Sequence, residues 1–240
     1  MAKTTWGLSG NQLKLIALIT MTIDHVGAYL LPQFTILRII GRLSMPIYAF
    51  LIAEGCYHTK NKLKYWGLMA GFALVWQLFS YFFLHSLKLC ILVTFSLSML
   101  LIFALQYVQK KKNFLSCLLF FALLAGVYWV SNNLSRYVPG CSIDYGFKGI
   151  LLPVFISLGT NKQQKVLGAA VGMCFLALGK TSQWYSLLAL PLLMLYSGQR
   201  GKGNYKYLFY IYYPLHLAAI YGVGWLLKNT GIQDWIQQYL

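Results

Sequence analysis

Apolar runs separated by short polar clusters repeat along almost the whole chain. A helix needs about 20 apolar residues to cross a bilayer core of about 30 Å, and most of the runs approach that length. The pattern predicts about nine membrane spans, at residues 12–31, 35–57, 65–84, 88–108, 113–131, 145–160, 165–180, 183–197 and 207–227. The three spans between 145 and 197 are short, so we expect them to be tilted, broken or partly re-entrant. Seven spans is the main competing count.

The composition agrees with a membrane protein. Of 240 residues, 59% are hydrophobic and 10% are charged, whereas soluble domains carry about 25% charged residues. A soluble globular protein is therefore excluded, and so is a disordered chain, which needs low hydrophobicity. We predict an all-α, polytopic integral membrane helix bundle that forms a single domain over residues 1–240.

The charge is strongly positive, with 20 Lys+Arg against 4 Asp+Glu and a net charge of +16. Cytoplasmic loops of membrane proteins retain Lys and Arg, and nine spans place most of these residues on the side of the N-terminus. That side holds Lys3, Lys14, Lys60, Lys62, Lys64, Lys110, Lys111, Lys112, Lys162, Lys165, Arg200, Lys202 and Lys206, and the other side Lys88, Arg136, Lys180 and Lys228. The distribution predicts N-in, C-out orientation. We expect no nucleic-acid partner, because the charge is spread over several short loops.

A few ionisable residues fall inside the predicted spans. Such groups are costly at bilayer depth and are therefore candidates for function. They are Asp24, His25, Arg38, Arg42, Glu54 and His216.

Helix geometry predicts that several of them meet. At 1.5 Å per residue, His25 lies roughly 16 Å beyond Lys14 on the same helix face. Arg42 lies about 10 Å below the outer boundary on the next span, and His216 lies about 13 Å above the inner boundary on the last. Asp24, His25, Arg42 and His216 are therefore expected at a common height near the midplane, contributed by three helices.

Each of these residues also has a purely structural interpretation. Asp24 can neutralise Arg42 or Arg38, or it can act in catalysis. His25 can be a core histidine bonded to a carbonyl, or a general base. His216 follows a proline that frees backbone groups, and it suits a structural role or a site.

Glu54 lies near the inner end of the second span. Its simplest interpretation is an interfacial ion pair with Lys14 or Lys60. The Lys60–Lys64 loop is by default a determinant of topology, but it can also attract an anionic cytosolic ligand.

Three stretches together resemble the TraX family of membrane proteins. They are KLIALITMTIDHVGAYLLP, RIIGRLSMPIYAFLIAEGCYHTKN and YLFYIYYPLHLAAIYGV, which begin at Lys14, Arg38 and Tyr207. The resemblance covers the first sixty residues well and the last span fairly, whereas the middle shares only a pattern of apolar helices.

The resemblance implies an activity. TraX proteins are known for acetylating the N-terminus of conjugative pilin, and they look related to the transmembrane acyltransferases, including acyltransferase family 3. That larger group carries a basic residue, ten intervening residues and a catalytic histidine, a spacing matched by Lys14 and His25. It also tends to carry Arg-x-x-Arg, from which Arg38-x-x-x-Arg42 departs by one residue.

We therefore expect an integral membrane acyltransferase of the bacterial cytoplasmic membrane. It would move an acetyl group from acetyl-CoA to an amine or hydroxyl of an extracytoplasmic acceptor, such as a pilin-like peptide N-terminus, a lipid or a glycan. No metal is expected. The predicted catalytic residues are His25, Asp24 and Arg42. The predicted contacts to the CoA donor are Lys14, Arg38, Glu54, Lys60, Lys64 and His216.

Two other functions fit the same residues. A secondary transporter or channel would use Asp24, His25 and Arg42 as a proton or ion relay. A membrane scaffold without enzymatic activity would tolerate joint substitution of the three residues.

Overall fold

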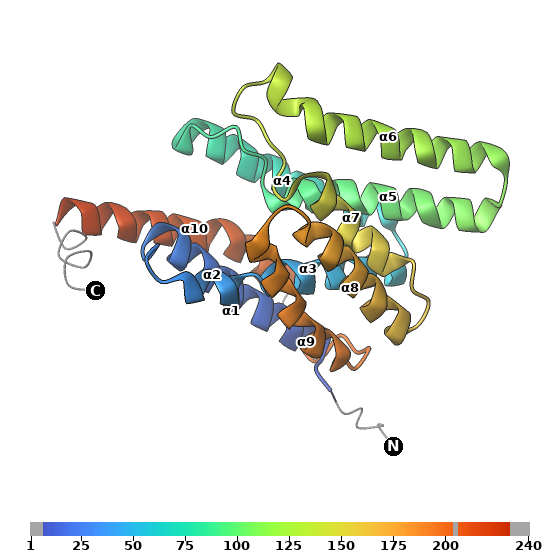
Figure 1. Cartoon of the computed structure of the whole chain (residues 1–240), viewed down its shortest axis with the longest axis horizontal. Helices are drawn as coiled ribbons and strands as arrows, with labels where there is room; N and C mark the ends of the chain where they lie inside the picture. The colour runs from blue at the N-terminus through green and yellow to red at the C-terminus, as the bar shows by residue number, and fades with distance from the viewer. Residues whose placement is uncertain (1–6, 204–205, 231–240) are drawn as a thin grey trace. The chain divides into compact units, whose positions relative to one another are not determined.

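The described part of the chain is built of helices. The structure is a computed structural model that describes residues 7–203 and 206–230, and within them β-structure is limited to two isolated bridges. The helices are α1 (Gly10–Tyr29), α2 (Thr35–Gly41), α3 (Ser44–His58), α4 (Lys62–Leu84), α5 (Ile91–Lys111), α6 (Phe114–Tyr137), α7 (Gly146–Ser157), α8 (Lys162–Ala177), the 3₁₀-helix η1 (Thr181–Ala189), α9 (Leu190–Met194) and α10 (Lys206–Asn229) (Figure 1). The predicted all-α class is confirmed, and every predicted span coincides with helical structure.

Four helical stretches of the described chain are long and apolar enough to cross a membrane. They are Thr35–His58, Lys62–Leu84, Ile91–Lys111 and Phe114–Tyr137. Large apolar side chains are exposed along α4 and α6, for example Phe83 and Phe121. Lipid is the natural environment for such surfaces, so the fold indicates a membrane protein.

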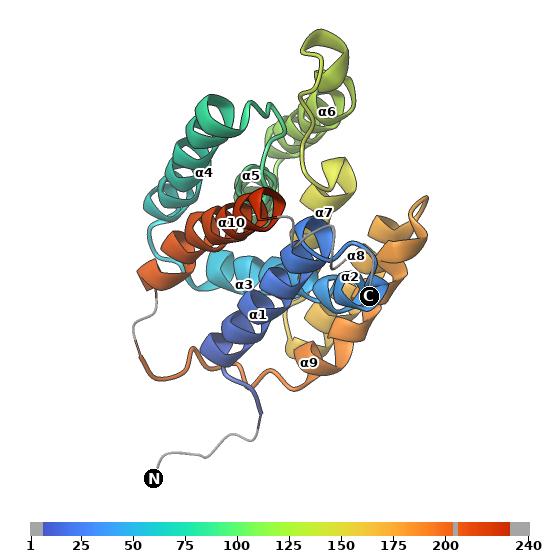
Figure 2. The same cartoon turned by 90° about the vertical axis from the view of Figure 1, so that its left-hand side faces the viewer.

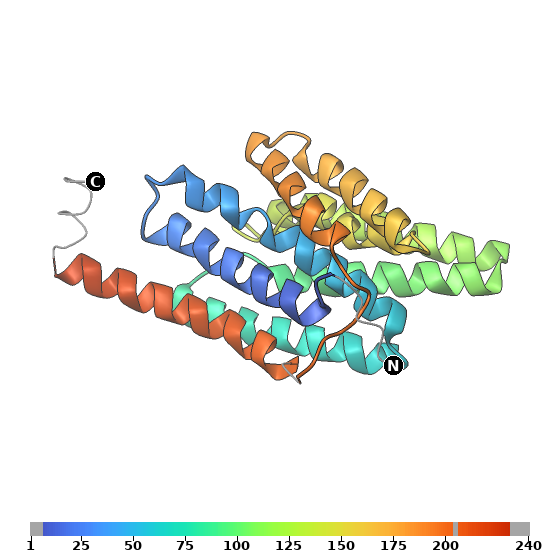
Figure 3. The ribbon, with the colours of Figure 1, turned by 90° about the horizontal axis from the view of Figure 1, so that it is seen from below.

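The chain divides into two compact units, which we describe separately. The first consists of Met1–Met45 with Tyr196–Leu240. In it α1 packs against both α2 and α10, and Figure 3 shows α1 and α10 running alongside each other. The segment after α9 is tied to the start of α1, because the Gly10 amide donates to the Gln199 carbonyl at 2.7 Å.

The predicted span 35–57 is interrupted between α2 and α3. Pro46, in the first turn of α3, has no N–H to donate to the Arg42 carbonyl four residues earlier. The chain instead makes a tighter turn, in which the Leu43 amide donates to the Ile40 carbonyl at 3.2 Å. This break puts Arg42 at a helix end inside an otherwise continuous apolar stretch.

The second unit, Pro46–Leu195, has α5 near its centre. Helix α5 packs against α4, α6 and α7, and α7 packs against α8 (Figure 2). Two hydroxyls one turn apart on α5 donate to carbonyls of the α7 region, Thr94 to Asp144 at 2.6 Å and Ser98 to Ile150 at 2.7 Å. These bonds provide hydrogen-bond partners for polar groups that lipid could not satisfy. They also fix the packing of α5 against α7.

Three turns of the second unit each end in an asparagine that caps the helix after it. Asn61, Asn113 and Asn161 are the N-cap residues of α4, α6 and α8, and each side chain accepts a bond from a backbone amide of the first helical turn. Asparagine is among the best N-cap residues, because its oxygen satisfies an otherwise unpaired donor. Lysines surround all three caps, so these turns combine helix initiation with positive charge.

The predicted span 183–197 is not a regular α-helix. It consists of η1 followed by the short α9, with Pro191 in the first turn of α9. Gln183, Ser186 and Ala189 form the buried face of η1, and a spacing of three residues matches the three residues per turn of a 3₁₀-helix. The expectation that this segment is irregular is therefore confirmed.

Candidate active site

Two glycines bring α1 and α2 into close contact in the first unit. A Cβ added at Gly41 would lie 2.1 Å from Asp24 Oδ1, and one added at Gly27 would lie 2.6 Å from Leu37 Cβ. Side chains larger than hydrogen are excluded at such distances. The missing side chain of Gly41 leaves the space in which the Asp24 carboxylate sits.

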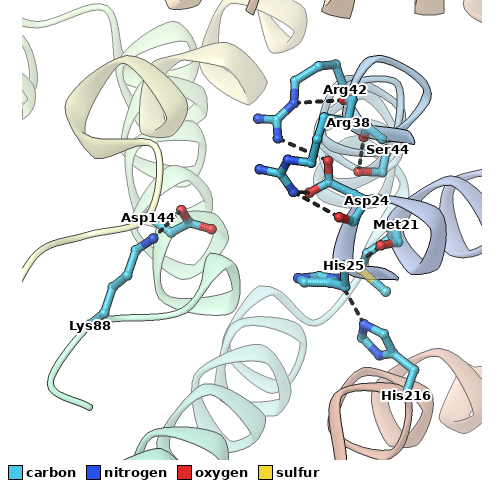
Figure 4. A network of polar contacts seen from close by, with 10 residues as sticks. Met21, Asp24, His25, Arg38, Arg42, Ser44, Lys88, Asp144 and His216 are labelled. Atoms are coloured by element: carbon cyan, nitrogen blue, oxygen red, sulfur yellow. Dashed lines mark hydrogen bonds and ion pairs between the residues drawn. The ribbon is translucent and has the colours of Figure 1, made fainter. Parts of the chain in front are cut away.

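Asp24 is held between two arginines (Figure 4). Arg38 Nη1 donates to Asp24 Oδ2 at 2.7 Å and to the Asp24 carbonyl at 2.9 Å. Arg42 Nη2 donates to Asp24 Oδ1 at 3.0 Å, and Arg42 Nε donates to the Arg38 carbonyl at 3.2 Å. Asp24 was expected to pair with Arg42 or Arg38, and it pairs with both. The cluster of one carboxylate and two guanidinium groups retains one surplus positive charge.

The two arginines differ in exposure. The Arg42 side chain is 9% exposed, whereas that of Arg38 is 37% exposed. Both Nε and Nη2 of Arg42 have partners, while the hydrogen bonds of Arg38 to the Asp24 carboxylate and carbonyl both come from Nη1. Arg42 is therefore suited to fixing Asp24, and Arg38 is better placed to meet a bound molecule.

His25 directly follows Asp24 in α1 and faces the last helix. His216 Nε2 lies 3.2 Å from His25 Nδ1 (Figure 4), and the ring centroids are 5.0 Å apart. His216 is buried and comes from the middle of α10, two residues after Pro214. The predicted convergence of Asp24, His25, Arg42 and His216 from three helical segments is therefore observed.

The hydrogen bonds of the two rings assign their neutral tautomers. Carbonyl oxygens only accept, and His25 Nδ1 lies 2.9 Å from the Met21 carbonyl while His216 Nδ1 lies 2.9 Å from the Tyr212 carbonyl. Each Nδ1 therefore carries the proton. The single Nδ1 proton of His25 is then shared between the Met21 carbonyl and His216 Nε2, which both accept. His25 Nε2 is left with a lone pair, as a general base requires.

Aromatic residues that the sequence analysis missed support both histidines. Tyr29 stacks on His25 and Tyr212 stacks on His216, each four residues away on the same helix and within 7° of parallel. The Tyr212 hydroxyl lies 2.9 Å from Thr22 Oγ1 and so links α10 to α1. Spacing of four residues between aromatic and histidine rings was the available signal, because such positions are neighbours on a helix surface.

The other predicted donor contacts are distributed over both units, and two of them belong to this cluster. Lys14 is half-buried in the second turn of α1, in the first unit, eleven residues before His25. Lys60 and Lys64 are exposed around the start of α4, in the second unit. Arg38 and His216, predicted to contact CoA, instead contact Asp24 and His25, respectively, which makes them part of the reactive cluster.

Glu54 requires a correction. Its carboxylate is paired with Lys165 of α8, not with the predicted Lys14 or Lys60, and His58 Nε2 lies 3.5 Å away. Lys165 also lies over the Tyr57 ring, 4.4 Å from the centroid. Both partners are buried, so Glu54 is occupied in a structural ion pair of the second unit and is not available to a CoA donor.

A metal centre is not formed by the described side chains. Within residues 7–203 and 206–230, no group of three or more His, Cys, Asp or Glu residues is placed to hold a metal ion.

Comparison with known proteins places the sequence in a family. The family described as TraX protein matches residues 9–224. A probable fimbrial assembly protein FimC, serogroup H1, of Dichelobacter nodosus is 28% identical over 88% of this chain and 94% of its own length. An uncharacterised protein of Rickettsia prowazekii (strain Madrid E) is 45% identical over 58 residues, 24% of this chain and 23% of its own. No solved structure matches. The family match spans all of the residues that form the cluster, and the chain belongs to the TraX family.

Proposed function

We propose that this chain is an integral membrane acyltransferase that moves an acetyl group from cytosolic acetyl-CoA to an extracytoplasmic amine or hydroxyl. The observation that carries the proposal is the contact between His25 and His216, at 3.2 Å, beside the Asp24–arginine cluster. Membership of the TraX family supports a transferase, because the resemblance described above implies pilin acetylation.

In this proposal His25 is the general base. Its Nε2 takes the proton from the acceptor as the acceptor nitrogen or oxygen attacks the thioester carbonyl. The imidazolium that forms is held by the Met21 carbonyl and the ring nitrogen of His216. When the tetrahedral intermediate collapses, the C–S bond breaks and His25 returns the proton to the departing thiolate, so that the proton balance closes.

Arg38 is the proposed donor to the oxyanion. An oxyanion needs donors that are already in position in a site that excludes water, and Arg38 is the half-exposed member of the cluster, bonded to Asp24 through Nη1. We propose Arg42, buried and bonded to Asp24, as a positioning residue in place of the direct role expected from the sequence. Asp24 orients both guanidinium groups.

Lys14 is the proposed contact of the donor in the first unit. It shares a helix face with His25 and lies roughly 16 Å from it along α1. An extended pantetheine arm spans a distance of this order. Its phosphates would then lie near Lys14 while the thioester reaches His25.

The proposed acceptor is the N-terminal amine of a pilin-like peptide. One relative is named as a probable fimbrial assembly protein, which agrees with the acceptor implied by the family resemblance. Such a peptide would approach from outside the bacterial cytoplasmic membrane, in which we propose an N-in, C-out topology with about nine spans. Hydroxyls of lipids or glycans are the acceptors to test next.

The test uses purified protein in proteoliposomes with labelled acetyl-CoA on one side and candidate acceptors on the other. The proposal predicts label on the acceptor with wild type and with His85→Asn, which changes an exposed histidine of the second unit. Proton or solute flux without CoA, and no transfer to any peptide, lipid or glycan acceptor, would favour a transporter that uses His25 and His216 as a relay.

A further inference from the structure

Three turns of the second unit lie toward one end of it. Gln106 Nε2 of α5 donates to the Cys56 carbonyl of α3 at 3.3 Å, and Lys62 of α4 lies over the Phe103 ring of α5, 5.3 Å from the centroid. The ion pair of Glu54 with α8 ties α3 to α8. The turns between α3 and α4, α5 and α6, and α7 and α8 therefore lie toward the same end of this unit (Figure 1).

These turns carry a concentrated positive charge, which we call the lysine-rich end. Its lysines are all exposed, whereas the nearby Glu54 is already neutralised by the buried Lys165. The other carboxylate of this unit, Asp144, pairs with Lys88. The lysine-rich end consists of Lys60, Lys62, Lys64, Lys110, Lys111, Lys112 and Lys162.

Large apolar side chains are exposed among these lysines. Leu63 lies between two of them and is 76% exposed, Phe114 follows the α5–α6 turn and is 83% exposed, and Leu158 precedes the α7–α8 turn and is also exposed. A soluble anion would leave these apolar groups in water. A lipid surface accepts both kinds of side chain, because apolar groups enter the acyl boundary while lysines contact the head groups.

We propose that the lysine-rich end binds the phosphate groups of anionic phospholipids. Clusters of four to eight basic residues next to membrane helices are attracted to anionic head groups, each by a factor of about five in affinity near the surface. Leu63, Phe114 and Leu158 then lie in the apolar layer beneath those head groups. Binding selects anionic over zwitterionic lipid and weakens as salt screens the charges.

The experiment counts the lipids that the full-length protein retains. Protein in neutral detergent micelles is mixed with phosphatidylglycerol or phosphatidylcholine at equal concentration, and bound lipid is measured by native mass spectrometry. The test variant combines Lys111→Gln with Lys162→Gln, which removes two charges from separate turns of the lysine-rich end. The control combines Arg136→Gln with Lys180→Gln, at the far ends of α6 and α8, and removes the same charge from exposed positions.

We expect wild type and the control to retain phosphatidylglycerol in preference to phosphatidylcholine. The test variant should bind phosphatidylglycerol about 25-fold more weakly, with an unchanged melting temperature in the absence of lipid. Equal losses in the two variants, or equal retention of the two lipids by wild type, would overturn the proposal. Displacement of phosphatidylglycerol by millimolar CoA at constant ionic strength would also overturn it, because the ligand would then be a soluble phosphate.

Discussion

Replacing Gly41 with alanine tests the close contact between α1 and α2. The added Cβ would lie 2.1 Å from Asp24 Oδ1, 2.3 Å from Asp24 Cβ and 2.5 Å from Asp24 Cγ. The Asp24 Cβ is fixed to the α1 backbone, so rotation of the side chain cannot relieve the overlap. Since non-bonded carbon atoms rest about 3.5–4.0 Å apart, the helices must separate by about 1 Å or more.

The cost follows from the contacts that this separation breaks. The side chains of Asp24 and Arg42 are 14% and 9% exposed, respectively. Loss of their ion pair is expected to destabilise the folded protein by about 3–5 kcal/mol. The gain in helix propensity from glycine to alanine offsets about 1 kcal/mol of this. We therefore expect Gly41→Ala to lower the free energy of unfolding by about 3 kcal/mol. The rate of acetyl transfer should fall about 100-fold, as for a 1 Å misplacement of a catalytic group.

The assay compares Gly41→Ala with Gly71→Ala. Gly71 lies within α4, and no atom lies within 4 Å of an added Cβ there, so this control should be neutral or more stable by up to about 1 kcal/mol. Unfolding is followed in mixed micelles of increasing denaturing detergent, and transfer is followed with labelled acetyl-CoA. If the two variants behave alike in both assays, the described approach of Asp24 to Gly41 is wrong.

Three further predictions concern single contacts. His216→Ala should lower kcat about 10- to 100-fold with KM for acetyl-CoA unchanged, because His216 positions His25. Steady-state kinetics measures both constants, and a parallel rise in KM would instead indicate that His216 contacts the donor. Tyr212→Phe removes the hydroxyl that bonds to Thr22 but keeps the stacked ring, so unfolding should show a loss of about 1 kcal/mol, and an unchanged stability would refute that bond. Glu54→Gln and Lys165→Met should each cost about 3–5 kcal/mol, and the double variant less than their sum; additive losses in the double-mutant cycle would contradict the buried pair.

Much of the candidate site follows from the sequence by counting residues along helices. Helical rise placed Asp24, His25, Arg42 and His216 at one depth, and the structure brings them together from α1, the α2–α3 break and α10. Few charged residues occur within the apolar runs, so a carboxylate at that depth needed a cation at the same depth. Helical rise and charge balance do not depend on how the helices pack, so the sequence alone reveals them.

Details that depend on packing were beyond the same reasoning. The partner of Glu54 is Lys165, more than a hundred residues away, and rise along one helix does not tell which helices are neighbours. The break before α3 follows from Pro46, but a proline in an apolar run is also compatible with a kinked continuous helix. The fine division of roles between Arg38 and Arg42 rests on exposure, which only the three-dimensional arrangement reveals.

The single-turnover rate of acetyl transfer by a His25→Gly variant tests the central proposal most directly. The cavity left by the ring admits imidazole, and the assay follows labelled acetyl-CoA to the acceptor with and without imidazole. We predict a rate about 100- to 10,000-fold below wild type, partly restored by imidazole, with binding of acetyl-CoA retained. Transfer by His25→Gly at the wild-type rate would contradict the proposed role of His25 as the base.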